Sequence, residues 1–69
     1  MNDKRQMTLT LSDSEMKLLE QLAERKELTK TGVIRMAIKL FQMVDERTAD
    51  GEKLFFETAD KQKTELALL

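Results

Sequence analysis

The sequence predicts a mainly α-helical fold with one N-terminal β-strand, completed as an intertwined homodimer and followed by a short C-terminal extension. Three observations lead to this fold class. An alternating segment precedes two helical segments, the second helical segment is apolar around most of its circumference, and the chain of 69 residues has no cysteine and no histidine. Domains of this size usually need a disulfide, a metal or a partner chain. Since the first two are disfavoured, we expect self-association.

The first expected element is a strand over residues 6–11. Met7, Leu9 and Leu11 alternate there with polar side chains, which is the period of a half-buried strand. No neighbouring segment can pair with this strand through a tight turn, and an unpaired strand leaves its backbone groups unsatisfied. We therefore expect it to pair antiparallel with the same strand of a second chain.

The second expected element is a helix from about Asp13 to Lys26. Ser12 and Glu15 have the spacing of a capping box at its start. At a step of about 100° per residue, the apolar side chains fall in one arc of about 160°, as in an ordinary amphipathic helix. These side chains are Met16, Leu18, Leu19, Leu22 and Ala23.

The third expected element is a helix from about Lys30 to Glu46, with Thr29 as its N-cap. Its apolar side chains span an arc of about 220°. A helix this apolar is buried on more than one side, and one strand and one short helix are too small to cover it. This is a second reason, independent of the strand, to expect a dimer. The apolar residues are Val33, Ile34, Met36, Ala37, Ile38, Leu40, Phe41, Met43 and Val44.

Residues 48–69 form a C-terminal extension for which two structures are open. A turn signal around Gly51 precedes one strand-like segment, and a second strand-like segment follows near the end of the chain. The alternative is a helix, because residues 59–69 are rich in helix-forming residues. The pattern favours a β-hairpin, with one face made of Leu54, Phe56, Leu66 and Leu68.

Composition limits the classes of function. The 12 Lys and Arg residues and the 13 Asp and Glu residues give a net charge of −1, so any binding to nucleic acid needs a local basic face. No apolar run approaches the length of about 18 residues that a membrane span needs, and the N-terminus does not resemble a signal peptide. We expect a soluble, cytoplasmic protein without metal or cofactor. Without histidine, cysteine or a glycine-rich loop, we expect no enzyme.

The order and spacing of these elements resemble the ribbon-helix-helix family of DNA-binding repressors, the Arc/MetJ/CopG-like proteins. The resemblance covers residues 4–46. It is carried by Arg-Gln-Met-Thr-Leu-Thr-Leu-Ser-Asp-Ser-Glu from Arg5, by Leu-Thr-Lys-Thr from Leu28, and by Val-Ile-Arg-Met-Ala-Ile-Lys-Leu-Phe from Val33. It implies a DNA-binding and dimerisation domain over residues 1–47, in which two strands form a ribbon in the major groove and the helices of both chains interlock.

The resemblance implies that Gln6, Thr8 and Thr10 read DNA bases. They are the outward-facing positions of the expected strand. Glutamine can bond adenine through two hydrogen bonds, and threonine can bond a base edge or contact a thymine methyl group. The alternative is that these side chains only face water, since threonine is a good strand former.

Phosphate contacts are implied at two further places: residues 4–5, which precede the expected strand, and residues 29–31 at the start of the second helix. The start of the second helix offers free N–H groups and the positive end of the helix dipole, and Gly32 lets a backbone come close. The alternatives are a solvated terminus and a plain helix cap. The residues implied to contact phosphate are Lys4, Arg5, Thr29, Lys30 and Thr31.

The sequence therefore predicts a transcriptional repressor that binds a specific double-stranded DNA sequence as a homodimer and can assemble further on DNA. The alternative is an antitoxin-like or other protein-interaction module whose C-terminal extension, residues 48–69, binds a partner protein. On a hairpin, Phe55, Ala67 and Leu69 would form a second, uncovered apolar face that suits such a partner.

Overall fold

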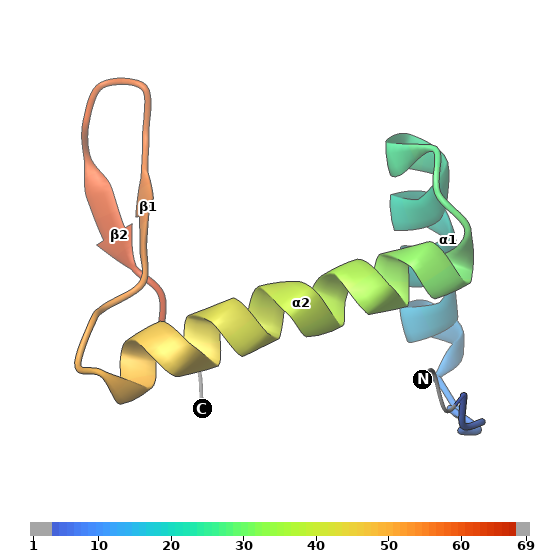
Figure 1. Ribbon diagram of the computed structural model, residues 1–69. Helices are drawn as coiled ribbons and strands as arrows, with labels where there is room; N and C mark the ends of the chain where they lie inside the picture. Colours follow the sequence, from blue (N-terminus) through green and yellow to red (C-terminus); the bar gives the residue numbers. More distant parts are fainter. Residues whose placement is uncertain (1–3, 68–69) are drawn as a thin grey trace. The chain divides into compact units, whose positions relative to one another are not determined.

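The computed structural model of the chain describes residues 4–67, which contain two helices and a two-stranded antiparallel sheet (Figure 1). The chain is mainly helical, as expected. The described residues fall into two compact units, which divide between Val33 and Ile34. In chain order the elements are α1 (Asp13–Lys26), α2 (Lys30–Ala49), β1 (Phe55–Glu57) and β2 (Lys63–Glu65).

Helix α1 begins and ends at the residues that its sequence signals predict. The N–H of Glu15 donates to the hydroxyl of Ser12 at 3.2 Å, and the N–H of Ser12 donates to the carboxylate of Glu15 at 2.9 Å. These two bonds complete the predicted capping box, which satisfies two donors that the helix itself leaves free. Leu19 and Ala23 of α1 are buried.

The connection after α1 is a tight, hydrogen-bonded reversal. The N–H of Leu28 donates to the carbonyl of Ala23 at 2.9 Å, and the N–H of Glu27 donates to the carbonyl of Glu24 at 3.2 Å. This is a Schellman motif, in which one residue takes the left-handed conformation. That residue is Glu27, with φ of 55°, a position where glycine is usual.

Helix α2 continues three residues beyond its expected end at Glu46 and runs to Ala49. The end is again a Schellman motif, because the N–H of Gly51 donates to the carbonyl of Thr48 at 3.0 Å and the N–H of Glu52 to the carbonyl of Arg47 at 3.1 Å. Gly51 takes the left-handed conformation, with φ of 88°. The expected boundary was wrong because only this glycine, and not the polar residues before it, stops the helix.

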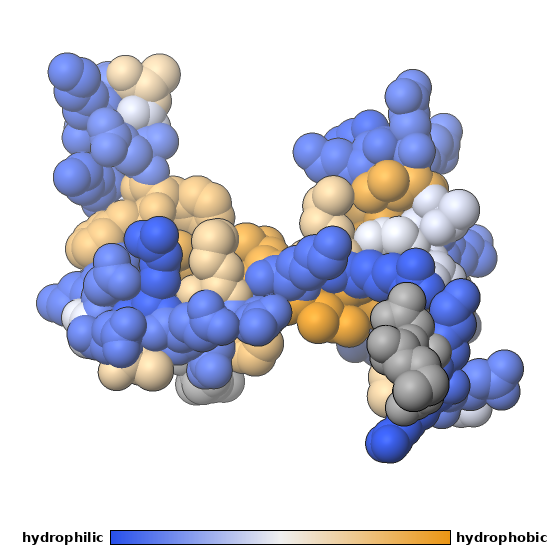
Figure 2. Space-filling view, in the orientation of Figure 1, coloured by the Kyte–Doolittle hydropathy of each residue, from blue (hydrophilic) through white to orange (hydrophobic). Residues whose placement is uncertain are grey.

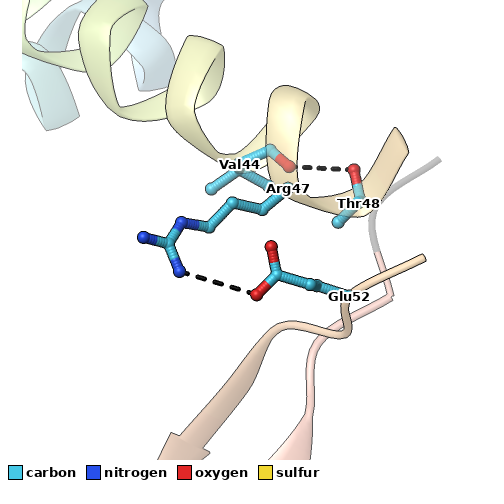
Figure 3. A network of polar contacts seen from close by, with 4 residues as sticks. All are labelled: Val44, Arg47, Thr48 and Glu52. Atoms are coloured by element: carbon cyan, nitrogen blue, oxygen red, sulfur yellow. Dashed lines mark hydrogen bonds and ion pairs between the residues drawn. The ribbon is translucent and has the colours of Figure 1, made fainter. Parts of the chain in front are cut away.

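Side chains support the end of α2 (Figure 3). The hydroxyl of Thr48 donates to the carbonyl of Val44 at 2.9 Å. In the same turn, a guanidinium nitrogen of Arg47 lies 3.6 Å from a carboxylate oxygen of Glu52, which follows the end of the helix. Val44 itself is buried. The last turn of α2 and the chain that leaves it are therefore held together locally.

Strands β1 and β2 pair antiparallel in the C-terminal extension. Leu54 and Leu66 continue the register, because the N–H of Leu66 donates to the carbonyl of Leu54 at 2.7 Å. Both therefore share a face with Phe56. Leu68 and Leu69, which were expected on the two faces, lie outside the described residues. The register pairs Phe55 with Glu65, Phe56 with Thr64, and Glu57 with Lys63.

Residues 58–62 connect the two strands, and Thr58 closes this connection. Its N–H donates to the carbonyl of Gln62 at 2.8 Å, and its hydroxyl accepts from the N–H of Gln62 at 3.0 Å. Lys61 reverses the chain with φ of 66°. The helical alternative for this extension is not found, since residues 59–67 contain no helix.

The N-terminal segment does not form the expected strand within this one chain. No backbone hydrogen bond joins residues 4–11 to another described residue, and no strand is present there. Met7 is 80% exposed and Leu9 is 50% exposed. The strand was expected only in a pair with a second chain, and no residue described in this single chain supplies the ladder that a strand needs, so the expectation stays a prediction.

The apolar core of one chain is very small. Among residues 4–67, only Leu19, Ala23 and Val44 are buried apolar residues. Helix α2, which was expected to be buried on more than one side, presents apolar surface to solvent (Figure 2). Exposed apolar surface of this extent is typical of a site for a protein, a ligand or a membrane. The large exposed side chains of α2 are Met36, Ile38, Leu40, Phe41 and Met43.

Candidate nucleic-acid interface

The three expected base-reading side chains, Gln6, Thr8 and Thr10, are all exposed. They alternate with Met7 and Leu9, which are exposed too. A glutamine amide offers donors and an acceptor, and each threonine hydroxyl offers both. The segment therefore presents a row of groups that can form hydrogen bonds with the edges of bases.

The segment leaves α1 in a defined direction at Ser12. Ser12 has an extended backbone, with φ of −68° and ψ of 165°. Its N–H donates to the carboxylate of Glu15. This bond, together with the one between the two side chains, lowers the pKa of Glu15 below its ordinary value. The carboxylate thus stays ionised and anchors the residue from which the segment departs.

Lys4 and Arg5 are exposed at the start of the described chain, directly before Gln6. Both can contact phosphate, arginine through two parallel hydrogen bonds. Among the described residues, no hydrogen bond or ion pair joins them to the start of α2.

The start of α2 has the features of an anion site. The N–H of Gly32 donates to the hydroxyl of Thr29 at 3.0 Å, which confirms Thr29 as the N-cap. The N–H groups of Lys30 and Thr31 have no acceptor within the helix, because the first turn lacks preceding carbonyls. No acidic residue lies in this turn. Thr29, Lys30 and Thr31 are exposed, so a phosphate oxygen can reach these donors.

Gly32 has a role within the chain itself. A Cβ atom at this position would lie 3.2 Å from the hydroxyl oxygen of Thr29 and 3.5 Å from the Cβ of Leu28. The absence of a side chain at Gly32 therefore lets the Thr29 side chain come close. This space allows the Thr29 hydroxyl to cap α2, and the expected approach of a DNA backbone stays a prediction.

Glu20 is a residue of this region that sequence reasoning did not identify. A carboxylate oxygen of Glu20 lies 3.4 Å from the ammonium nitrogen of Lys30, and each side chain is 52% exposed. Ion pairs this exposed stabilise a fold by only about 0–1 kcal/mol, so phosphate can compete for Lys30. No local signal could have revealed the pair, because it depends on the left-handed reversal at Glu27 between the two helices.

Comparisons with known proteins identify no relative: no family model, no curated protein and no solved structure matches the chain. Within residues 4–67, no three acidic side chains gather closely enough to bind a metal ion. Neither of the two helices found there has the length and hydropathy to cross a bilayer. The features of the chain that point to a function are the exposed N-terminal segment, the start of α2 and the exposed apolar side chains of α2.

Proposed function

We propose that the chain is a homodimeric DNA-binding protein of the ribbon-helix-helix kind that represses transcription from a specific site. In this proposal, residues 6–11 of two chains pair as an antiparallel ribbon that enters the major groove. The observation that supports it best is the exposed N-terminal segment, which alternates polar and apolar side chains and has no backbone partner among the described residues.

A second chain would supply both things that the single chain lacks: a hydrogen-bonding partner for residues 6–11 and a cover for the apolar side chains of α2. Pairing two such segments gives the backbone groups of each strand their partners. Strand alternation then places Met7, Leu9 and Leu11 of both chains on one face, where they cover apolar side chains of α2. Burial contributes about 25 cal/mol per Å² of apolar surface, so the open face of α2 favours association.

The opposite face of the ribbon carries Gln6, Thr8 and Thr10 of both chains. A two-stranded ribbon fits the major groove, and these side chains match the donor and acceptor patterns of bases there. Lys30, with the N–H groups at the start of α2, supplies phosphate contacts that fix the position of the ribbon. Bound in this way, the dimer acts as a steric block to transcription. The chain acts in this proposal as a binding protein and not as an enzyme.

Binding of a partner protein by the C-terminal extension is the second candidate function. Phe55 is 46% exposed and Phe56 is 65% exposed. An open groove of about 310 Å³ lies between the last turns of α2 and β1, with Met43, Val44 and Leu54 in its lining. An antitoxin-like protein would use such a surface to hold its partner. This function and DNA binding use different residues, so one chain can perform both.

Selection from a pool of randomised DNA duplexes tests the proposal. Wild type is compared with Gln6→Ala/Thr8→Ala, and Gln21→Ala on the exposed face of α1 is the matched control. Light scattering first establishes that all three proteins have the same mass in solution. We expect wild type and the control to enrich the same short site and the double variant to enrich none. Enrichment of that site by the double variant would show that the ribbon does not read bases.

The salt dependence of binding provides a separate test. If Lys4, Arg5 and Lys30 of each chain contact phosphate, the logarithm of the binding constant falls with the logarithm of salt concentration with a slope of about −5. Lys30→Ala removes two contacts per dimer and should reduce the slope by about 2. A slope that Lys30→Ala leaves unchanged would contradict phosphate binding at the start of α2.

A further inference from the structure

Among residues 4–67, no strand covers the second edge of β2, and the hydrogen bonds show which residues face this open edge. Within that range, β2 pairs with β1 in a two-stranded sheet. The backbone bonds from Leu66 to Leu54 and from Thr58 to Gln62 mark two hydrogen-bonded pairs. Since such pairs alternate along an antiparallel ladder, Phe56 and Thr64 form the pair between them. The N–H and C=O groups of Lys63 and Glu65 therefore point away from β1, toward the open edge.

Two copies of this edge can pair so that their opposite charges face each other. If two copies of β2 pair antiparallel about a two-fold axis at Thr64, Lys63 of each copy lies opposite Glu65 of the other. Opposite charges directly across a ladder stabilise the pair. The residues that form hydrogen bonds in this register are Lys63 and Glu65, the two whose backbone groups are free. An axis on either of these residues would instead place two identical charges opposite each other, which destabilises a pair.

The free edge of β1 lacks this complementarity. Its outward backbone groups belong to Phe55 and Glu57, because Phe56 is bonded to β2. A two-fold axis at Phe56 would place Phe55 of one copy opposite Glu57 of the other. No pair of opposite charges forms in that register, so the edge of β2 is the better self-pairing surface.

We propose that the edge of β2 is a self-association surface, through which two copies of this chain join their sheets into one sheet of four strands in the order β1-β2-β2-β1. A sheet of two strands is marginally stable alone, whereas one of four strands is within the usual range. All residues of β1 and β2 are exposed in one chain. This contact is separate from the N-terminal ribbon and does not depend on DNA binding.

Cysteine cross-linking of the full chain tests the register. The chain has no cysteine, so Thr64→Cys introduces a single thiol. The two Thr64 positions form a non-hydrogen-bonded pair at the axis, with Cα atoms about 4.5 Å apart, a separation that a disulfide spans. Glu57→Cys on β1 is the matched control, because its two copies would lie more than about 14 Å apart across three strand spacings.

Under mild oxidation we expect Thr64→Cys to form a covalent dimer at least about tenfold faster than Glu57→Cys, because a disulfide needs Cα atoms within about 7 Å. Equal rates would show that the dimers come from random collision and would overturn the proposal. Slow cross-linking of both would also overturn it, since charges on an edge strand can serve to prevent pairing.

A charge swap tests the pairing of Lys63 with Glu65. Lys63→Glu and Glu65→Lys are each added to Thr64→Cys, so that one chain carries two acids and the other two bases beside the thiol. Each variant alone should cross-link about tenfold more slowly than Thr64→Cys. Their equimolar mixture should recover the rate and give mainly the mixed dimer by mass spectrometry. If either variant lost its sheet, the mixture would not recover the cross-linking rate. Recovery would therefore show that the slow rate of each variant comes from charge repulsion and not from unfolding. A mixture that cross-links no faster than its components would overturn the proposal.

Discussion

The ammonium group of Lys30 at the start of α2 lies 3.4 Å from the carboxylate of Glu20 in α1. The pair places a negative charge beside the Lys30 ammonium group, which is proposed to bind phosphate. In the proposed DNA-bound state, that carboxylate would repel the phosphate and compete for Lys30. We therefore expect Glu20→Gln to tighten DNA binding by about threefold to tenfold at low salt, an effect that weakens as salt screens the charges. Fluorescence anisotropy with a selected duplex measures it.

Glu24→Gln is the matched control, because it makes the same change in net charge at an exposed position of the same helix. We expect a smaller effect on affinity from this control. Combining Glu20→Gln with Lys30→Ala should remove most of the gain, since the carboxylate acts through Lys30. If Glu20→Gln and Glu24→Gln tighten binding equally, only the net charge matters and the ion pair has no specific role.

The two helix ends predict opposite effects of substitution on stability. Glu27 and Gly51 occupy the same left-handed position of two Schellman motifs. Glu27→Gly should raise the free energy of unfolding by about 0.5–1 kcal/mol, because a side chain is strained in this conformation. Gly51→Ala should lower the free energy of unfolding by about 1 kcal/mol. Its cost comes from backbone conformation alone, because nothing lies within 4 Å of the added Cβ.

Urea denaturation at one fixed protein concentration measures both changes, since the stability of an associating protein depends on concentration. Gln21→Ala, on the exposed side of α1, provides a reference for a substitution outside these motifs. A loss of stability in Glu27→Gly would mean that the Glu27 side chain has contacts that outweigh its backbone strain.

The capping box predicts how the stability of α1 depends on pH. The hydrogen bonds from Ser12 lower the pKa of Glu15 in the folded chain. A carboxylate of this kind stabilises the fold above its unfolded pKa of about 4.3, and the stabilisation is lost as the pH falls through the lowered pKa. Glu15→Gln keeps an acceptor for the Ser12 N–H but does not titrate. The urea midpoint of wild type should therefore fall relative to that of Glu15→Gln below about pH 4. A constant difference between the two midpoints from about pH 7 to about pH 3 would contradict this.

Local signals predicted the local parts of this structure. Ser12 and Glu15 are three residues apart, and the side chain of each accepts a hydrogen bond from the backbone N–H of the other. Thr29 caps α2 through one bond, from the N–H of Gly32 to its hydroxyl. Such bonds involve neighbours in sequence, so the pattern alone specifies them. The start of both helices could be placed for this reason.

Features that depend on distant residues could not be predicted in this way. The pair of Glu20 with Lys30 requires the reversal at Glu27, and a glutamate gives no sequence signal for a left-handed backbone. The strand expected at residues 6–11 requires a ladder partner, which no described residue of the chain supplies. Alternation indicates which residues fit a strand, but the partner that satisfies its backbone has to come from elsewhere.

Adjacent residues of the N-terminal segment should have separable functions in the proposed dimer. Leu9, 50% exposed in one chain, becomes buried beneath the ribbon, whereas Thr8 faces DNA. Truncating a buried leucine to alanine costs about 2–5 kcal/mol, and each dimer holds two copies. We therefore expect Leu9→Ala to raise the dimer dissociation constant by at least about a hundredfold in sedimentation equilibrium. Thr8→Ala should leave that constant unchanged while it lowers discrimination between selected and random DNA. If Leu9→Ala and Thr8→Ala raise the dimer dissociation constant equally, or if neither raises it, residues 6–11 are not the interface between the chains.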